Sequence, residues 1–174
     1  MFYTIKTSYC QDLPDSLNGT IDKPVNEIFS ISFETVFNSD DFMMGFLPGL
    51  HLQNLNLTAG VLFLFRPYKK KIRVERSTNL YYQFQEWRYV FGICLEKRFN
   101  LVNTIALSLS AGGGYTFGEY AGTSTSAKTS FLPILRIGIN KEYNKTLFCL
   151  RYQFMEIPNV NNHQVNLSFI YMFK

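Results

Sequence analysis

The chain has 174 residues, which suits one domain, with a formal net charge of +4 and only 17% charged residues. Hydrophobic residues make up 47% and aromatic residues 17%, an excess of Phe and Tyr that favours β-strands. No stretch approaches the roughly 20 continuous apolar residues of a membrane-spanning helix. The composition therefore argues against helical membrane spans, a typical soluble surface and, because the charge is modest, a nucleic-acid surface.

The N-terminal residues 1–26 are polar and interrupted by Pro14, Asn18-Gly19 and Pro24. Such a segment predicts a short irregular arm rather than part of a regular fold. It also lacks the apolar core of a secretory signal, so for an exported protein we expect that the signal was removed.

From residue 27 to residue 174, apolar and polar residues alternate with a period of two, which is the pattern of strands with two different faces. The alternating runs cover residues 29–37, 42–53, 57–66, 87–98, 105–117, 135–140, 148–154 and 164–173. Pro48 lies within the second run, where it predicts a bulge or an irregular stretch.

The connections between these runs differ in length. Those after the second, fourth and sixth runs are tight, whereas 67–78 and 118–128 are long and polar. A meander of about eight strands, with short turns at one side and longer loops at the other, is typical of a transmembrane β-barrel.

Two features decide which face of the strands meets lipid. The polar face carries many small residues, which suit the narrow lumen of an eight-stranded barrel. The apolar face carries large aromatic residues near the ends of the runs, which predicts aromatic girdles at the two membrane interfaces. The predicted girdle residues are Trp87, Tyr89, Tyr115, Phe117, Tyr152, Tyr171 and Phe173.

Charged residues on the polar face would then lie in the lumen. They are Glu34, Arg66, Arg88, Glu96, Arg98, Arg136 and Arg151. Because unpaired charges in a narrow barrel are unfavourable, we expect them to pair and to fill the lumen rather than to open a pore.

The residues from Leu167 to Phe173 resemble the terminal strand by which bacterial outer-membrane barrels are recognised for insertion. The segments 91–99 and 107–117 resemble strands of small eight-stranded outer-membrane proteins of the OmpX and OmpA transmembrane-domain type. The resemblance is one of pattern, and the final Lys174 departs from it. It implies a barrel over 27–174 in the bacterial outer membrane, an N-terminal arm on the periplasmic side, and folding by the barrel-assembly machinery through the C-terminal strand.

No motif indicates a cofactor or a metal. The glycines between Ala111 and Tyr115 lack the Gly-Lys-Ser/Thr ending of a phosphate loop, and the three cysteines lack metal-ligand spacing. His51 is the one candidate for a lipid-A-modifying enzyme, but glutamine follows at the position where such enzymes carry a nucleophile. A hydrogen-bonded lumen histidine is the alternative interpretation.

A basic cluster stands in the longest predicted loop. Its members are Lys69, Lys70, Lys71, Arg73 and Arg76. They predict either a solvated loop or strand extension, or an extracellular surface that contacts lipopolysaccharide phosphates or an acidic partner.

Three functions remain open on the sequence alone. The first is a non-enzymatic outer-membrane barrel, either a surface-binding protein or an accessory subunit of a larger complex, that binds lipid, lipopolysaccharide or other outer-membrane proteins through the loops 67–86 and 118–128. The second is a soluble lipocalin-like barrel whose apolar face lines a ligand cavity. The third is the lipid-modifying enzyme using His51.

Overall fold

The computed structural model describes residues 29–52, 57–77, 80–102, 104–120, 126–158 and 160–173. The predicted arm over 1–26 lies outside these ranges. Every regular element within them is a β-strand, and none of the described residues forms a helix able to cross a membrane. The strands are β1 Phe29–Phe37, β2 Phe42–Leu52, β3 Leu57–Phe65, β4 Lys70–Ser77, β5 Leu80–Val102, β6 Ile105–Tyr120, β7 Ser126–Tyr143, β8 Thr146–Met155 and β9 His163–Phe173.

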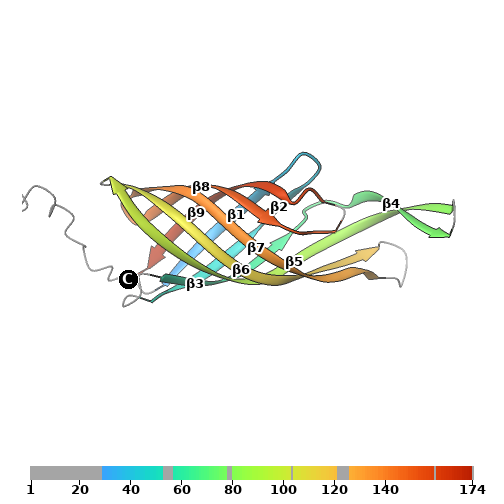
Figure 1. Cartoon of the computed structure of the whole chain (residues 1–174), viewed down its shortest axis with the longest axis horizontal. Helices are drawn as coiled ribbons and strands as arrows, with labels where there is room; N and C mark the ends of the chain where they lie inside the picture. The colour runs from blue at the N-terminus through green and yellow to red at the C-terminus, as the bar shows by residue number, and fades with distance from the viewer. Residues whose placement is uncertain are drawn as a thin grey trace, which may run out of the picture.

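Eight of these strands close into a barrel with antiparallel neighbours (Figure 1). Strand β1 pairs with β2 on one side and with β9 on the other, and the pairing of β3 with β5 closes the ring. Strand β4 stands outside the ring, because it pairs only with the first part of β5. The prediction of an eight-stranded, antiparallel, up-and-down barrel is confirmed.

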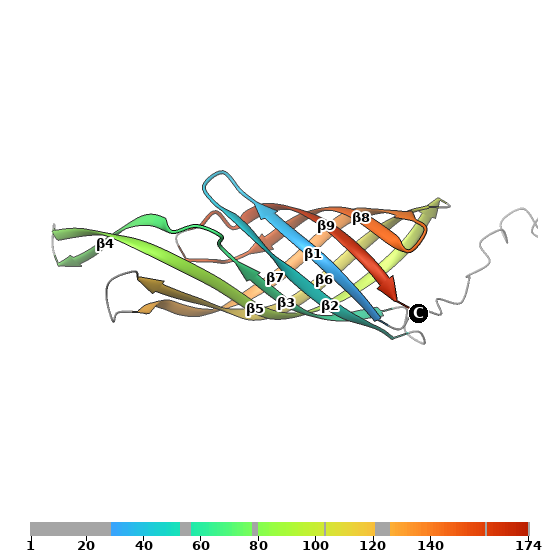
Figure 2. The same ribbon diagram turned by 180° about the vertical axis from the view of Figure 1, so that it is seen from behind.

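The two ends of the barrel differ in shape. At the end where β1 begins and β9 finishes, here called the terminal end, the turn at Asn144-Lys145 joins β7 to β8, with Asn144 at a φ of 56° that asparagine tolerates. At the opposite end, here called the loop end, β4 and the start of β5 extend as a hairpin well beyond the barrel (Figure 2).

Several strands are longer or more regular than the sequence predicts. All of β4 lies within residues 67–78, which were predicted to form a loop or a strand extension, and β5 begins at Leu80, before the alternating run that starts at Trp87. Of the two alternatives predicted at Pro48, a bulge or an irregular stretch, the bulge is wrong: Pro48 pairs with Ile31 of β1, and the register between β2 and β3 is the same before and after it. The ladder to β3 is only interrupted there, as expected for a residue without an N–H.

The strands are inclined to the barrel axis, as the register shows. A row of directly paired residues starts at Leu57, at the terminal end of β3, and ends at Phe42, at the loop end of β2. The row runs Leu57, Lys97, Leu109, Ile137, Tyr152, Val165, Phe37, Phe42. Such inclination is what closing a sheet of this size into a barrel requires.

The apolar face of the barrel points outward. The exposed large apolar side chains, such as Phe91, Ile93 and Leu95, are between 38% and 68% accessible, whereas the residues alternating with them are buried inside. This is the arrangement of a barrel that meets lipid. It is the reverse of the arrangement that a soluble ligand-carrying barrel requires, and the inside is filled with side chains.

Candidate functional site

The middle of the lumen holds a set of paired charges, here called the central network: Glu34, Glu96, Arg98, Arg136 and Arg151. Arg151 links the two carboxylates of the central network. Its Nη2 donates to Glu96 at 2.8 Å, and its Nη1 lies 3.6 Å from Glu34. Glu96 also accepts a hydrogen bond from Nε of Arg98 at 2.8 Å. Glu34 lies on β1, Glu96 on β5 and Arg151 on β8, so these contacts join three strands across the inside of the barrel.

Uncharged side chains complete the coordination of the central network. Glu34 accepts hydrogen bonds from Ser32 at 2.5 Å and from Asn166 at 2.8 Å, and Arg151 donates to Ser168 at 2.5 Å. These short polar residues fit beside the long guanidinium side chains in the narrow lumen. Asn166 and Ser168 lie on β9, the strand in which polar and apolar residues alternate most clearly.

Arg136 is the exception in this network. Its side chain is buried, and none of its three nitrogens has a hydrogen-bond partner among the described residues. Its nearest carboxylate oxygen, on Glu34, lies 3.7 Å away. The network thus contains two carboxylates and three guanidiniums, so Arg136 adds a cation that the other members do not balance.

A second set of charges, the loop-end network, lies under the projecting hairpin and comprises Asp41, Arg66, Glu86 and Arg88. Arg66 donates through Nε to Asp41 at 2.8 Å and through Nη1 to Glu86 at 3.1 Å. Glu86 in turn pairs with Arg88, whose Nη1 donates to Thr116 at 3.1 Å. Two carboxylates balance two guanidiniums here, and all four side chains are buried.

Asp41 lies in the turn between β1 and β2, outside the strands that would cross a membrane. Burial by itself raises the pKa of its carboxyl group, but hydrogen bonds from Arg66 and Tyr68 and the positive charge of Arg66 outweigh burial and hold the pKa below its ordinary value of 3.8. Tyr68 donates to Asp41 at 2.7 Å. The carboxylate is therefore charged at neutral pH and ties the turn to the end of β3.

An apolar layer separates the two networks. On β3, Leu62 and Leu64 precede Arg66, and on β5, Val90 lies between Arg88 and Glu96. Leu62, Leu64 and Val90 belong to one buried apolar cluster. The members of this cluster are Val36, Met43, Leu62, Leu64, Val90, Cys94, Leu132, Ile134, Met155 and Ile157. The lumen is thus blocked by an apolar layer as well as by ion pairs.

The predicted lumen residues can now be placed. Glu34, Glu96, Arg98, Arg136 and Arg151 come together in the central network, whereas Arg66 and Arg88 belong to the loop-end network. Sequence reasoning missed Asp41 and Glu86, the partners of those last two residues. For Glu86 a signal existed, because it shares the inner face of β5 with Arg88, two residues further on.

The basic cluster lies on the projecting hairpin. Lys69, Lys71 and Arg73 alternate along the chain and are all exposed, whereas Ile72, on the opposite face of β4, is buried. Lys71 and Arg73 pair with Gln85 and Gln83 of β5. Lys70 and Arg76 also belong to β4, and the side chain of Arg76 lies outside the part of the chain that the structure describes.

This basic row continues the outer wall of the barrel. The ammonium of Lys69 lies 5.4 Å from the ring centroid of Trp87, a cation–π contact. Trp87 begins the outward series of β5 that continues through Tyr89 and Phe91. Three cations, Lys69, Lys71 and Arg73, therefore stand in line directly beyond the aromatic residues at the loop end.

The predicted girdle residues fall near both ends of the wall. Tyr89 pairs with Phe117, and Tyr115, also exposed, follows nearby on β6, all toward the loop end with Trp87. Tyr152 lies in the loop-end half of β8. Tyr171 and Phe173 lie at the terminal end, with their ring centroids 4.9 Å apart.

His51 lies on the inner face of β2 near the terminal end. Its Nδ1 is 2.8 Å from Oγ1 of Thr58, and no serine or carboxylate bonds to its ring among the described residues. Ser108, a buried serine of β6, donates to Oδ1 of Asn140 at 3.3 Å. The two described cysteines, Cys94 and Cys149, are buried and unpaired.

The geometry defines a barrel with a filled lumen, an apolar outer wall and a basic hairpin, which is the fold of small outer-membrane barrels. The sequence matches no protein-family model and no curated protein. Among solved structures, the chain is similar to the N-terminal β-barrel domain of Pseudomonas aeruginosa OprF, with a TM-score of 0.62 and 7% identity over 84% of this chain and 98% of that one.

Two further solved structures share the fold. Neisserial surface protein A (NspA) matches with a TM-score of 0.57 and 11% identity, over 83% of this chain and 94% of that one. The Yersinia pestis outer-membrane protein Ail, solved in a phospholipid bilayer nanodisc, matches with a TM-score of 0.50 and 13% identity, over 84% and 99%. At these identities the likeness concerns the fold alone.

Proposed function

We propose that the chain is a non-enzymatic protein of the bacterial outer membrane that binds the phosphate groups of lipopolysaccharide through its β4–β5 hairpin. The observation that carries this proposal is the basic row Lys69, Lys71 and Arg73, exposed on the continuation of the lipid-facing wall. Lipopolysaccharide phosphates would lie just beyond the apolar part of the outer leaflet, at the height of this row. Ammonium and guanidinium groups are the usual partners of phosphate.

The difference between the two ends of the barrel supports this location and one orientation in the membrane. The start of β1, the end of β9 and the short turn between β7 and β8 lie at the terminal end, as expected for the periplasmic side, and the long hairpin lies at the other end. In this orientation residues 27–174 form the membrane barrel, the arm over 1–26 lies in the periplasm, and the C-terminal strand β9 engages the barrel-assembly machinery. Gel mobility with and without boiling, in an outer-membrane fraction of cells expressing the exported chain, tests this part; a band that does not shift would overturn it.

Binding to lipopolysaccharide is tested with the full chain in nanodiscs. We expect the triple variant Lys69→Gln, Lys71→Gln, Arg73→Gln to lose most of the affinity for added lipopolysaccharide, and the loss to shrink at high salt. Lys141→Gln is the matched control, since Lys141 is exposed at the terminal end. Equal binding by the triple variant and the wild type would contradict the proposal.

A second role is favoured by the free edge of β4. This strand pairs with β5 on one side only and has no neighbour on the other among the described residues. An open edge accepts an extended segment of a partner by strand addition. As an accessory subunit, the protein would bind another outer-membrane protein here, and cross-linking from a cysteine placed at Lys70 would identify contacts with it.

The absence of enzymatic activity is also part of this proposal. It is supported by the bond of His51 to Thr58 within the lumen, away from outer-leaflet lipid. Mass spectrometry of lipid A from cells with the wild-type chain and with His51→Ala should give identical spectra. A modification that depends on His51 would establish the enzyme instead.

A further inference from the structure

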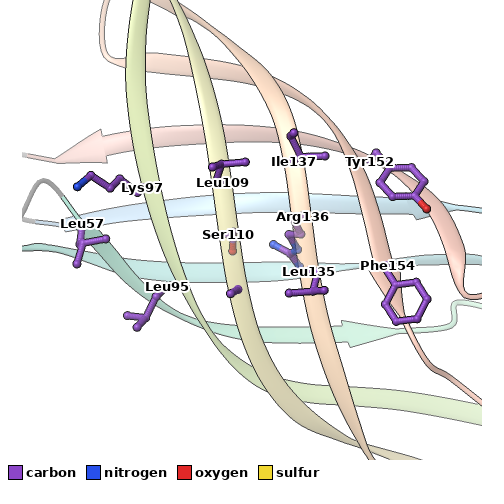
Figure 3. Close-up of a pocket in the computed structure, with 11 residues that line it drawn as sticks. Leu57, Leu95, Lys97, Leu109, Ser110, Leu135, Arg136, Ile137, Tyr152 and Phe154 are labelled. Carbon is purple, nitrogen blue, oxygen red and sulfur yellow. The ribbon is translucent and has the colours of Figure 1, made fainter.

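A groove of about 440 Å³ lies in the outer wall of the barrel (Figure 3). Two parallel rows of paired residues border it on strands β5 to β8. One row is Lys97, Leu109, Ile137 and Tyr152, and the other is Leu95, Ala111, Leu135 and Phe154. Ala111 is the smallest of these side chains, so the wall recedes between its long neighbours.

The groove runs obliquely along the barrel. The row through Lys97 starts at Leu57, the first residue of β3 at the terminal end, and rises toward the loop end through Tyr152. Leu95, Leu109 and Leu135 are between 42% and 52% exposed, so the groove opens outward, although the buried residues Ser110 and Arg136 also line it. Its shape and its apolar lining fit a hydrocarbon chain.

Lys97 gives the groove a charged end. It is exposed on an otherwise apolar part of the wall, and its ammonium lies 5.8 Å from the ring centroid of Phe99. No carboxylate of the described residues forms an ion pair with it. A lysine on the lipid face is unfavourable near the middle of a bilayer, but near its edge it can extend to the headgroups.

We infer that this groove binds an anionic phospholipid of the periplasmic leaflet, with one acyl chain along the groove and the headgroup at Lys97. Two features favour an anionic phospholipid: the apolar groove on the lipid-facing wall fits an acyl chain, and the cation of Lys97 at the periplasmic end of the groove attracts an anionic headgroup. The inference goes beyond the proposed binding of lipopolysaccharide, which concerns the opposite end of the molecule. It depends on insertion into a bilayer but not on the basic row of the hairpin.

Native mass spectrometry of the full chain, released from mixed micelles with equal phosphatidylglycerol and phosphatidylethanolamine, tests the inference. We expect the wild type to retain phosphatidylglycerol preferentially. Lys97→Met should lower this preference about fivefold, the effect of one lysine near an anionic surface, and Ala111→Leu should lower the retention of both lipids by filling the groove. Lys141→Met and Thr35→Leu are matched controls, because Lys141 is exposed at the terminal end and Thr35 lies on β1, away from the strands that border the groove.

Two results would overturn the inference: unchanged retention in both Lys97→Met and Ala111→Leu, or equal losses in the two controls. Because a variant can fail to fold, cross-linking of the wild type with phosphatidylglycerol that carries a photoreactive acyl chain gives a second measurement. The cross-links should map to residues 95–111 and 135–154; cross-links spread evenly over all strands would contradict a defined site. Neither result depends on whether the hairpin binds lipopolysaccharide.

Discussion

At the scale of single residues, the two buried arginines at the centre of the lumen differ in their contacts. Arg151 bonds to Glu96 and Ser168 and lies close to Glu34, whereas Arg136 makes no hydrogen bond among the described residues. Removing one partner of a buried ion pair strongly destabilises a protein because it leaves a buried charge uncompensated, whereas a buried charge that is already poorly paired is itself unfavourable. Removal of Arg151 should therefore destabilise the protein much more than removal of Arg136, although both side chains are charged and buried.

We predict that Arg151→Met lowers the free energy of unfolding by about 3–5 kcal/mol, because it leaves two buried carboxylates with fewer partners. Arg136→Met should change it by less than about 1.5 kcal/mol, because it balances the central network at two charges of each sign and keeps a side chain of similar volume. Reversible urea unfolding in lipid vesicles measures both. A larger loss for Arg136→Met than for Arg151→Met would show that this account of the network is wrong.

A glycine makes room for Arg151. A Cβ at Gly138 would lie 2.4 Å from Cγ of Arg151 and 2.4 Å from the carbonyl oxygen of Leu150, and backbone cannot easily move away. We predict that Gly138→Ala costs about 1–3 kcal/mol. Gly49→Ala is the control, since its added methyl group lies closest to the side chains of Thr58 and Ser30, at 3.0 and 3.1 Å, and the nearest backbone atom, the carbonyl oxygen of Ala59, is at an ordinary contact distance of 3.6 Å. Equal stabilities of the two variants, in the same urea measurement, would contradict the prediction.

At the scale of elements, the loop-end network connects three parts of the chain. Asp41 comes from the turn between β1 and β2, Arg66 from the end of β3, and Glu86 from the point where β5 enters the barrel. This network is what holds the base of the projecting hairpin against its neighbours. Because all of its charges are buried, its strength depends on the charge of Asp41.

That dependence predicts an effect of acid. The pKa of Asp41 is lower in the folded protein than its ordinary value of 3.8, so its contribution to stability is complete above that pH and is lost as the pH falls through the folded pKa. We expect the stability difference between the wild type and Asp41→Asn to be constant from pH 8 to pH 5 and to shrink below about pH 4. Taking the difference removes the effect of the other carboxylates. Urea unfolding of both proteins at several pH values measures this stability difference. A difference that already shrinks between pH 7 and pH 5 would show that the charge of Asp41 does not have the stabilising role described here.

The elements also show how far the sequence predicts the fold. Within the apolar wall, each strand has one face for lipid and one for the lumen, so alternation predicts the strand and the face of residues such as Glu34 and Arg136. Beyond the wall this contrast disappears, which is why the alternation by itself places the beginnings of β5 and β7 too late in the chain. Ion-pair partners depend on the register between strands, and Asp41 lies in a turn without periodicity, so its pairing with Arg66 could not be read from the sequence.

At the scale of the whole molecule, the contents of the barrel form a sequence of layers along its axis. From the terminal end these are an apolar cluster with Leu147 and Ile170, the central network, the apolar layer with Leu62 and Leu132, and the loop-end network. A passage for ions would have to cross all of them. Water and ions are poorly accommodated by the apolar layer, and the ion pairs on either side occupy the polar groups that could replace an ion's hydration shell.

We therefore predict that the protein does not conduct ions. Reconstituted in planar lipid bilayers at high salt, the folded chain should give no single-channel steps, whereas a general porin under the same conditions provides the positive control. Replacing Leu62, Leu64 and Leu132 together with serine removes the apolar layer but keeps both networks, and we expect it to permit at most small, brief currents. Stable conductance steps from the wild type would mean that the ion pairs and the apolar layer rearrange together, and that the barrel is a gated channel rather than a surface scaffold for its hairpin.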